Sequence, residues 1–331
     1  MQRRRLVSLA AASAVVAASA PTRAGASSAD AVQQAGDLGA AIGQFLELPG
    51  DKSYVVHVGQ GGSIGRIAHR PKLFLFTASA YKTFVLGQYL RDVEAGLLSE
   101  DEPLALNDSV RNIGSPVFID LSGELQARSV LDAMMGYSDN TATDMATAKV
   151  GADRVRALIA AAGLSSIRIP DSTRLFASYV FGAPPNVDLG WPGIRQAAEN
   201  PPGMLRPPLN DVITLAGTAR DFVSWYEQAL AGAFFAKPET LAEFKRIQST
   251  SVQIPLTIPE NTPAYAKGGE VVSLNGFNAK SFAGQMIVGN TPLTFCFIVN
   301  WNGPAEEFEP VQAAFFAAIK AILTAIKQGL Q

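Results

Sequence analysis

Cysteine and histidine are scarce in this chain of 331 residues. The one cysteine, Cys296, cannot form a disulfide within the chain, and a zinc site would need a cluster of cysteines that the sequence does not have. The two histidines, His57 and His69, lie in stretches that are typical of strands, so they do not favour a Ser-His-Asp catalytic triad. We therefore expect no metal, and we look for a catalytic base among other side chains.

An excess of positive charge is also absent. Lysine and arginine total 27 against 29 aspartate and glutamate, a net charge of −2, whereas nucleic-acid-binding domains carry a basic surplus. The composition is 48% hydrophobic and 17% charged, which is typical of a folded protein with a sizeable core. We expect one large or two medium domains and no nucleic-acid partner.

The N-terminus has the three parts of a secretory signal. Arg3–Arg5 precede a short apolar run over residues 6–20, and the small residues Ala24–Ala26 precede Ser27. We predict a signal peptide over residues 1–26 that resembles a twin-arginine signal; Sec export and a retained anchor are the alternatives. Its removal takes four arginines, which leaves 23 basic against 29 acidic residues and a net charge of −6. An exported chain without disulfides suits a bacterial periplasm, or secretion.

Apolar runs near both ends of the chain predict strands. They are residues 53–59 and 63–69 near the N-terminus, and 263–268, 281–288 and 293–300 near the C-terminus. Helical periodicity dominates elsewhere. The predicted helices are 30–47, 79–97, 123–136, 141–149, 152–162, 218–231, 238–248 and 309–329. Residues 165–215 hold eight prolines and are predicted to form a long irregular segment.

This order of elements predicts an α+β fold with three layers (α/β/α). One antiparallel sheet is built from both chain ends, at about 27–76 and 250–331, and an all-helical lobe at about 77–249 lies between them. The last predicted helix is apolar, but Lys320 and Lys327 interrupt it, so we expect no stable membrane span in the mature chain. We also expect a monomer.

Ser79 and Lys82 form a candidate catalytic pair. A serine hydroxyl is a weak nucleophile that needs an adjacent base, and with histidine scarce a lysine is the next candidate. Three residues of spacing place both side chains on one face of a predicted helix, whose N-terminus would favour a developing negative charge. Lys82 is the only lysine in the chain with a serine three residues before it. Alone, this spacing also arises by chance.

Two further short segments carry polar groups suited to the same chemistry. Ser138, Asp139 and Asn140 follow an apolar helical run, and a hydroxyl and a carboxamide on one loop can relay a proton and hold a substrate amide. An ordinary helix N-cap is the alternative, since all three residue types favour that position. Lys267 precedes Gly268 and Gly269 at the end of a predicted strand, where the alternative is a turn.

Taken together, the three segments occur in order, 59 and 129 residues apart. This arrangement resembles the S-x-x-K, S-D-N and K-T-G elements of the serine β-lactamase and penicillin-binding-protein superfamily, and it is closest to class A β-lactamases. The resemblance spans essentially the whole mature chain and implies a β-lactamase-like fold. It also implies a small-molecule substrate (a β-lactam or an ester) and no cofactor.

The resemblance implies a role for each matching residue. Ser79 would be the acylated nucleophile and Lys82 its proton partner, while Ser138 would pass a proton to the leaving nitrogen. Asn140 would bind the side-chain amide of the substrate, and Lys267 would place positive charge near Ser138 and the substrate carboxylate. The oxyanion hole would consist of the backbone N–H groups of Ser79 and of Glu270, which follows Gly269.

Three departures from the family pattern affect the expected reaction. Class A enzymes carry a glutamate between the second and third elements as the base for deacylation, but no E-x-x-x-N occurs in 165–215. Glu199 is the nearest positional match, and a solvated loop acid is the alternative. Gly268 lacks the hydroxyl of K-T-G. The carboxylate of Glu270 would repel an anionic β-lactam, unless it turns outward or neutralises Lys267.

Three functions remain open on these grounds. The first is a β-lactamase that opens the lactam amide through a Ser79 acyl-enzyme. The second is an esterase or a peptidoglycan-type peptidase with an altered deacylation loop. The third is a penicillin-binding scaffold that does not hydrolyse its ligand. Every residue that acylation needs is in place, whereas hydrolysis of the acyl-enzyme depends on a base that the sequence does not identify.

Overall fold

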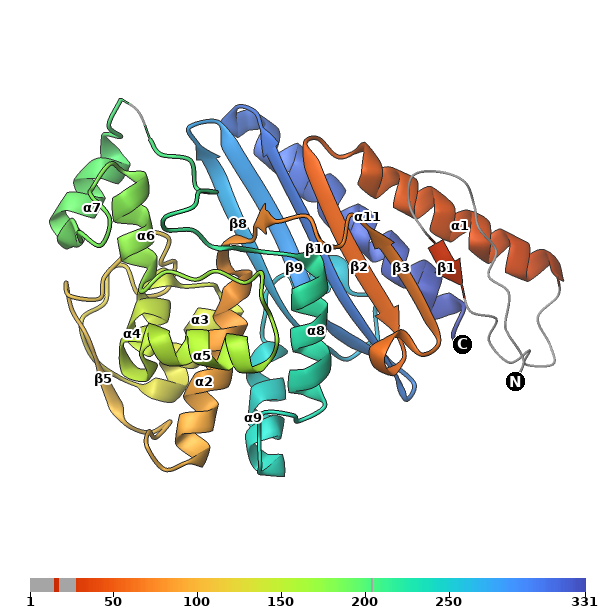
Figure 1. Cartoon of the computed structure of the whole chain (residues 1–331), viewed down its shortest axis with the longest axis horizontal. Coiled ribbons are helices and arrows are strands. Elements are labelled where there is room, and N and C mark those ends of the chain that lie inside the picture. The colour runs from red at the N-terminus through yellow and green to blue at the C-terminus, as the bar shows by residue number, and fades with distance from the viewer. Residues whose placement is uncertain (1–14, 18–27, 204) are drawn as a thin grey trace.

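Six strands form one antiparallel sheet at the centre of the fold (Figure 1). The structure, a computed structural model, describes residues 15–17, 28–203 and 205–331. Across the sheet the strands are β1 (Val15–Ala17), β3 (Gly65–His69), β2 (Asp51–Val58), β10 (Thr291–Asn302), β9 (Phe277–Val288) and β8 (Ala264–Leu274). The N-terminal strand β2 pairs directly with the C-terminal strand β10, which confirms that both chain ends build one sheet.

The central position of β10 follows from its almost continuous apolar sequence, because side chains on both faces of the strand are buried. Cys296 lies at its middle, opposite Val55 of β2 and Ala283 of β9. Its side chain is buried, and burial raises the pKa of its thiol well above the usual range. Cys296 is therefore a small apolar core residue, as the sequence predicted.

Two helices at the chain ends cover one face of the sheet (Figure 1). α1 (Ser28–Glu47) and α11 (Phe308–Gln328) pack against each other on this face. An apolar cluster that includes Phe45, Phe297 and Phe315 fills the space between the helices and the strands. The helical lobe covers the opposite face, so the three-layer arrangement is confirmed.

The C-terminal segment Ala305–Gln328 is long and apolar enough to cross a membrane by length and composition. In the structure, Phe315, Ile319 and Ile322 of α11 are fully buried in the cluster against the sheet. The absence of a stable membrane span in the mature chain stays a prediction.

The lobe is helical apart from short strand pairs. β5 (Pro103–Leu106) pairs with β6 (Gly123–Gln126), and β4 (Leu75–Phe76) pairs with β7 (Ala216–Gly217). Its helices are η2 (Ala78–Tyr81), α2 (Lys82–Glu94), α3 (Ala127–Gly136), α4 (Asn140–Val150), α5 (Ala152–Ala161), α6 (Thr173–Val180), α7 (Gly190–Glu199), α8 (Ala219–Leu230) and α9 (Pro238–Gln248). The short helix α10 (Ile254–Thr257) packs against α11 outside the lobe. Two further 3₁₀ turns outside the lobe are η1 (Gln60–Gly62) and η3 (Ala305–Glu307).

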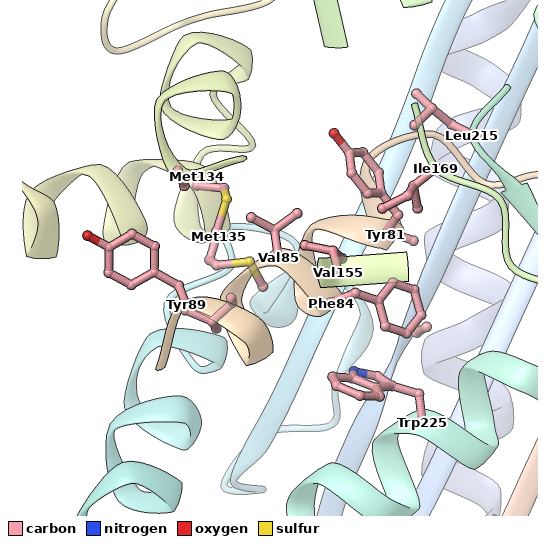
Figure 2. Packing of buried hydrophobic residues seen from close by; sticks show 14 of the residues in the cluster. Tyr81, Phe84, Val85, Tyr89, Met134, Met135, Val155, Ile169, Leu215 and Trp225 are labelled. Carbon is pink, nitrogen blue, oxygen red and sulfur yellow. The ribbon is translucent and has the colours of Figure 1, made fainter. Parts of the chain in front are cut away.

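Helix α2 runs through the middle of the lobe core. Figure 2 shows Phe84 and Val85 of this helix among side chains from several other elements, with Trp225 of α8 beside Phe84. Trp225 is completely buried and donates a hydrogen bond to the hydroxyl of Thr83, so its one polar group is satisfied. This packing fixes α2, and with it the turn that precedes the helix.

The structure differs from the predicted elements at several places, and β8 and β9, for example, are longer than the strands predicted at 263–268 and 281–288. The helix predicted from residue 79 begins at Lys82, after a 3₁₀ turn, and the helix predicted from 123 begins at Ala127, after strand β6. The segment 165–215 is not irregular throughout, since it contains α6 and α7. The predicted signal peptide, 1–26, lies outside the described residues except for β1, which pairs with β3.

Candidate active site

Ser79 lies in the 3₁₀ turn η2, directly before α2, and its side chain is partly exposed. The turn is bound on two sides. Thr77 donates its backbone N–H to the carbonyl of Leu215, and its own carbonyl accepts a hydrogen bond from Ser281 Oγ at 2.6 Å. Ala78 adopts a positive φ of 47°, a conformation that costs energy for a non-glycine residue and that these contacts maintain.

Gly269 of β8 brings the third motif against this turn. A Cβ atom at position 269 would lie 2.3 Å from the Thr77 carbonyl oxygen and 2.6 Å from the backbone nitrogen of Ser79. Only glycine permits so close an approach. The strand that carries Lys267 and Glu270 is therefore packed directly on the backbone of Ser79, where the family resemblance implies an oxyanion hole.

Lys82 is completely buried beneath the cleft. Its amine donates hydrogen bonds to the carbonyl of Ser138 at 2.5 Å and to Asn140 Oδ1 at 2.8 Å, and it lies 3.4 Å from Ser138 Oγ. Burial lowers the pKa of Lys82 to about 7, although the carboxylates of Asp139 and Asp144 act in the opposite direction. No hydrogen bond joins Lys82 to the Ser79 hydroxyl among the residues that the structure describes. Because its pKa is lowered, the Lys82 amine can accept a proton near neutral pH.

Ser138 connects Lys82 to the third motif. Its backbone has a positive φ of 62°, and its hydroxyl accepts a hydrogen bond from Lys267 Nζ at 2.9 Å. Burial, and then the nearby charge of Lys82, lowers the pKa of Lys267 well below the usual range. The Ser138 hydroxyl thus contacts two lysines, both of which release protons more readily than an exposed lysine does.

Asp139 and Asn140 lock the loop in place. Asp139 caps α4 by accepting a hydrogen bond from the N–H of Ala142 at 2.8 Å, and it also accepts the N–H groups of Val117 and Phe118. Asn140 donates to the carbonyl of Ile113 at 2.9 Å. The N-cap interpretation is therefore confirmed for Asp139, and the roles of Ser138 and Asn140 towards a substrate stay predictions.

Two cavities meet at Ser79. The first, here called the motif arm, has a volume of about 630 Å³ and is lined by residues that include Ser138, Gln253 and Lys267. The second, the α6 arm, has a volume of about 350 Å³ and includes Phe76, Asn112, Thr173, Phe176, Ala177, Val180, Phe181, Leu215 and Leu274. Both arms are also lined by Ser79, Ile113, Gly114, Asn140, Glu270, Val271 and Val272. The predicted motifs therefore surround one cleft, beside a partly exposed serine.

Glu270 lines both arms but is not a free charge. Its carboxylate pairs with Lys280 of β9 at 2.5 Å, and the side chain of Lys280 is fully buried. Glu270 thus forms its ion pair with Lys280, a pairing that the sequence did not indicate. Repulsion of an anionic substrate is reduced accordingly.

Gln253 occupies the space that a side chain at position 268 would need. A Cβ atom on Gly268 would lie 1.7 Å from Gln253 Oε1. This oxygen is buried without a hydrogen-bond partner, and Gln253 lines the motif arm beside Lys267. The side-chain amide of Gln253 therefore occupies the place of the hydroxyl that Gly268 lacks in the K-T-G position. No local signal in the sequence indicated a role for Gln253.

The structure does not bring Glu199 to the site. Glu199 lies on the exposed face of α7 at the end of the helix, 3.6 Å from Arg195, and it lines neither arm. Among the described residues that line the two arms, Glu270 is the only one with a carboxylate. The geometry therefore favours the solvated loop acid over the deacylation base for Glu199.

A buried carboxylate that the sequence analysis missed, Asp144 of α4, holds the loop segment beside the cleft. It accepts hydrogen bonds from the N–H and the hydroxyl of Thr173, at 2.6 and 2.8 Å, and from the N–H of Arg174. Burial raises the pKa of Asp144 to about 6, against the effect of these hydrogen bonds and of the Lys82 charge. Asp144, four residues after Asn140, therefore holds the start of α6 in position beside the cleft.

No group of three or more metal-ligating side chains occurs in the described part of the chain.

Comparisons with known proteins agree with this geometry. A family model described as the β-lactamase enzyme family matches residues 47–276. The fold is similar to a β-lactamase from Sphaerobacter thermophilus (19% identity, TM-score 0.67, covering 89% of this chain and 98% of that one) and to a β-lactamase from Xanthomonas campestris pv. campestris (16%, 0.66, 89% and 99%). It is also similar to PBP-A, solved as the L158E mutant in an acyl-enzyme complex with penicillin G (14%, 0.63, 90% and 97%).

No curated protein sequence matches the chain. At identities below 20% the solved structures establish the fold, whereas the family model covers well over half of the residues, including all three motifs. The chain therefore belongs to the β-lactamase enzyme family, within the superfamily of serine β-lactamases and penicillin-binding proteins.

Proposed function

We propose that this protein is an exported serine hydrolase that opens β-lactam amides through an acyl-enzyme on Ser79, and that the acyl-enzyme is then hydrolysed slowly. One observation carries the proposal: the Ser79 turn, the Lys82–Ser138 contact and the Lys267–Ser138 hydrogen bond meet at one cleft.

Acylation uses groups that are all present at the cleft. Ser79 Oγ attacks the lactam carbonyl carbon, and the hydroxyl proton passes to the neutral amine of Lys82. The bond between the carbonyl carbon and the ring nitrogen breaks, and Ser138 gives its proton to that nitrogen and regains one from Lys82. The backbone N–H groups of Ser79 and Glu270 would stabilise the oxyanion.

Deacylation has fewer groups to rely on. A water molecule needs a base to attack the Ser79 ester, and no carboxylate from the described part of segment 165–215 lines either arm. Slow hydrolysis of the acyl-enzyme is the expected consequence.

Intact-protein mass spectrometry after exposure to penicillin G tests the proposal. Ring opening loses no atoms, so the expected product is heavier by the whole mass of the antibiotic, and Ser79→Ala should not gain this mass. Nitrocefin should be turned over slowly. Absence of an adduct and of nitrocefin hydrolysis would refute acylation by β-lactams, and rapid nitrocefin turnover would refute slow deacylation.

A second candidate function is an esterase or a peptidoglycan-type peptidase. The observation that favours it is the change at positions 268 and 270, where the family hydroxyl is missing and a carboxylate is added. Hydrolysis of p-nitrophenyl esters without a penicillin adduct would support it. If the protein forms no penicillin adduct and hydrolyses no ester, the non-hydrolysing scaffold is the function that remains.

Export is part of the proposal and rests on residues 1–26. Expression in a Gram-negative host should place the protein in the periplasmic fraction with Ser27 as its first residue. N-terminal sequencing checks this, and an intact Met1 would contradict it.

A further inference from the structure

The backbone directly before Ser79 is strained at one residue. Ala78 has a positive φ of 47°, in the left-handed region that residues other than glycine adopt at a cost, and its side chain is buried. If the peptide between Thr77 and Ala78 turned over, φ would return to the negative values that alanine prefers. The fold must therefore hold this peptide in place.

One side chain of the sheet binds the peptide that precedes Ala78. Ser281 of β9 is buried, and its hydroxyl donates a hydrogen bond to the Thr77 carbonyl oxygen at 2.6 Å. This oxygen belongs to the same peptide whose orientation sets φ of Ala78. If the peptide turned over, the oxygen would point away from Ser281 and the hydrogen bond would be lost. The hydrogen bond therefore opposes relaxation of the strain.

The Thr77 carbonyl oxygen also closes the turn that contains Ser79. It accepts a second hydrogen bond, at 3.2 Å, from the backbone N–H of Ala80 in η2. Ser79 lies inside this hydrogen-bonded loop, and its own N–H is one of the two donors expected for the oxyanion hole. If the peptide turned over, the loop would open. The orientation of one carbonyl group therefore affects both the hydroxyl and the N–H of Ser79.

The chain on the other side of this peptide is fixed. Asn300 of β10 is buried, its Oδ1 accepts the N–H of Phe76 at 2.8 Å, and its Nδ2 donates to the Phe76 carbonyl at 2.9 Å. The N–H of Thr77 donates to the carbonyl of Leu215 at 2.8 Å. Because these contacts hold Phe76 and the N–H of Thr77, the peptide between Thr77 and Ala78 is the place where the backbone can relax.

We propose that Ser281 is a positioning residue for the reaction of Ser79, and that its hydrogen bond to Thr77 holds the strained turn in the conformation that is acylated. This inference rests on the proposed function of Ser79. Without the Ser281 hydroxyl the buried carbonyl loses one of its two donors, and Ala78 is free to relax. Only a fraction of the molecules would then present Ser79 in the reactive conformation.

Acylation by p-nitrophenyl acetate measures this fraction. Ser79 Oγ bonds to the acetyl carbon, the bond to the phenolic oxygen breaks, and p-nitrophenolate leaves while the serine proton moves to Lys82. With enzyme in excess, the release of p-nitrophenolate reports acylation alone. We expect Ser281→Ala to lower this rate about tenfold, a factor that matches the usual cost of backbone strain at one residue.

A second substitution distinguishes positioning from a general structural role. Glycine adopts a positive φ without strain, so Ala78→Gly removes the tendency of the turn to relax. In the Ala78→Gly background, Ser281→Ala should therefore lower the rate only about twofold. A purely structural contact would give the same loss in both backgrounds, because Ala78→Gly adds no contact.

Ser53→Ala is the matched control. Ser53 is a buried serine of β2 in the same sheet, and its hydroxyl donates to the carbonyl of Arg70 at 3.0 Å. Neither residue lines an arm of the cleft, so the acylation rate of this variant should equal that of the wild type. Urea denaturation of every variant establishes that it is folded.

The outcomes separate this inference from the proposed function. An unchanged rate in Ser281→Ala, or an equal loss in the wild-type and Ala78→Gly backgrounds, refutes the positioning role while the function of Ser79 stands. If neither this ester nor penicillin G acylates the wild type, both are refuted. A loss that Ala78→Gly reduces, and that Ser53→Ala does not share, supports the positioning role.

Discussion

The motif arm and the α6 arm share one serine but differ in what their polar groups do. Ser138, Lys267 and Gln253 line the motif arm; Lys82, buried beneath it, and Lys267 both contact the Ser138 hydroxyl, and Gln253 has an unpartnered oxygen. In the α6 arm, Asn112 and Thr173 are bound to each other and to Asp144. The two sides of Ser79 therefore differ in chemistry: one presents groups that can exchange protons, and the other presents a mainly apolar surface.

The same comparison separates the two halves of the catalytic cycle. The groups for acylation come from three motifs that are spread over the chain but held together by strand β8 and the Ser138 loop. In class A enzymes the base for deacylation comes from the segment between the second and third motifs. In this protein the same segment, 165–215, supplies apolar side chains to the α6 arm. The four experiments that follow, ordered from the largest expected effect to the smallest, would break or sharpen this division.

Replacement of Lys82 by methionine should lower the rate of Ser79 acylation by about 10²–10⁴-fold, because the base that accepts the serine proton is removed. Release of p-nitrophenolate with enzyme in excess measures this rate. Lys149→Met is the matched control, since Lys149 is partly exposed and pairs with Glu102 away from the cleft. Wild-type acylation by Lys82→Met would show that another group activates Ser79.

Gly269→Ala should lower acylation by about 10²–10³-fold, the typical effect of losing one oxyanion-hole donor. The added methyl group cannot fit 2.3 Å from the Thr77 carbonyl, so the Ser79 turn and β8 must move apart. The penicillin adduct, followed over time by mass spectrometry, measures the effect. Gly65→Ala on β3, where a Cβ meets no atom within 4 Å, should leave the rate unchanged. An equal loss in both variants would indicate a general strand effect.

Asp144→Asn should reduce the free energy of unfolding by about 1–3 kcal/mol. An amide cannot accept all the hydrogen bonds that the two carboxylate oxygens take from Thr173, Arg174 and Asn112, so one N–H group would face another donor. Urea denaturation measures the change. Asp153→Asn, at a side chain that is 95% exposed, is the control. Unchanged stability would mean that Asp144 does not hold α6 against α4.

Acylation by a neutral ester should rise about tenfold between pH 6 and pH 8. With a pKa of about 7, the neutral fraction of Lys82 grows from about one tenth to about nine tenths over this interval, and only the neutral amine accepts the serine proton. A pH series of p-nitrophenyl acetate acylation gives the profile, and Lys82→Met should abolish the rise in its residual rate. A flat wild-type profile would assign the base to another group.

Much of the fold was predictable because its signals are local. Alternating and continuous apolar runs placed the strands, and the almost wholly apolar run from Leu293 to Asn300 identified the central one. The predictions were less accurate where tertiary contacts decide the outcome. Helix α2 begins only at Lys82 because Gly269 and Ser281 hold the preceding turn in a different conformation.

The site was predictable to the extent that its residues stand in motifs. Ser79, Ser138 and Lys267 lie around one cleft as expected, although their catalytic roles stay predictions. Gln253 could not be found in this way, since it lies against position 268 although the two are 15 positions apart in the sequence. Glu199 was chosen by counting positions along the segment 165–215. The sequence did not predict helices α6 and α7 in this segment, and position counting is unreliable where the path of the chain is unknown.

The pairing of β2 with β10 has a consequence for biosynthesis. Lys267, Gly269 and Ser281, which complete and support the cleft, are translated about two hundred residues after Ser79. A ribosome-bound chain that has emerged only as far as α9 possesses Ser79 and Lys82 but neither the edge strand nor its neighbours. The candidate site is therefore not assembled until the last third of the polypeptide has been made and folded back onto the first.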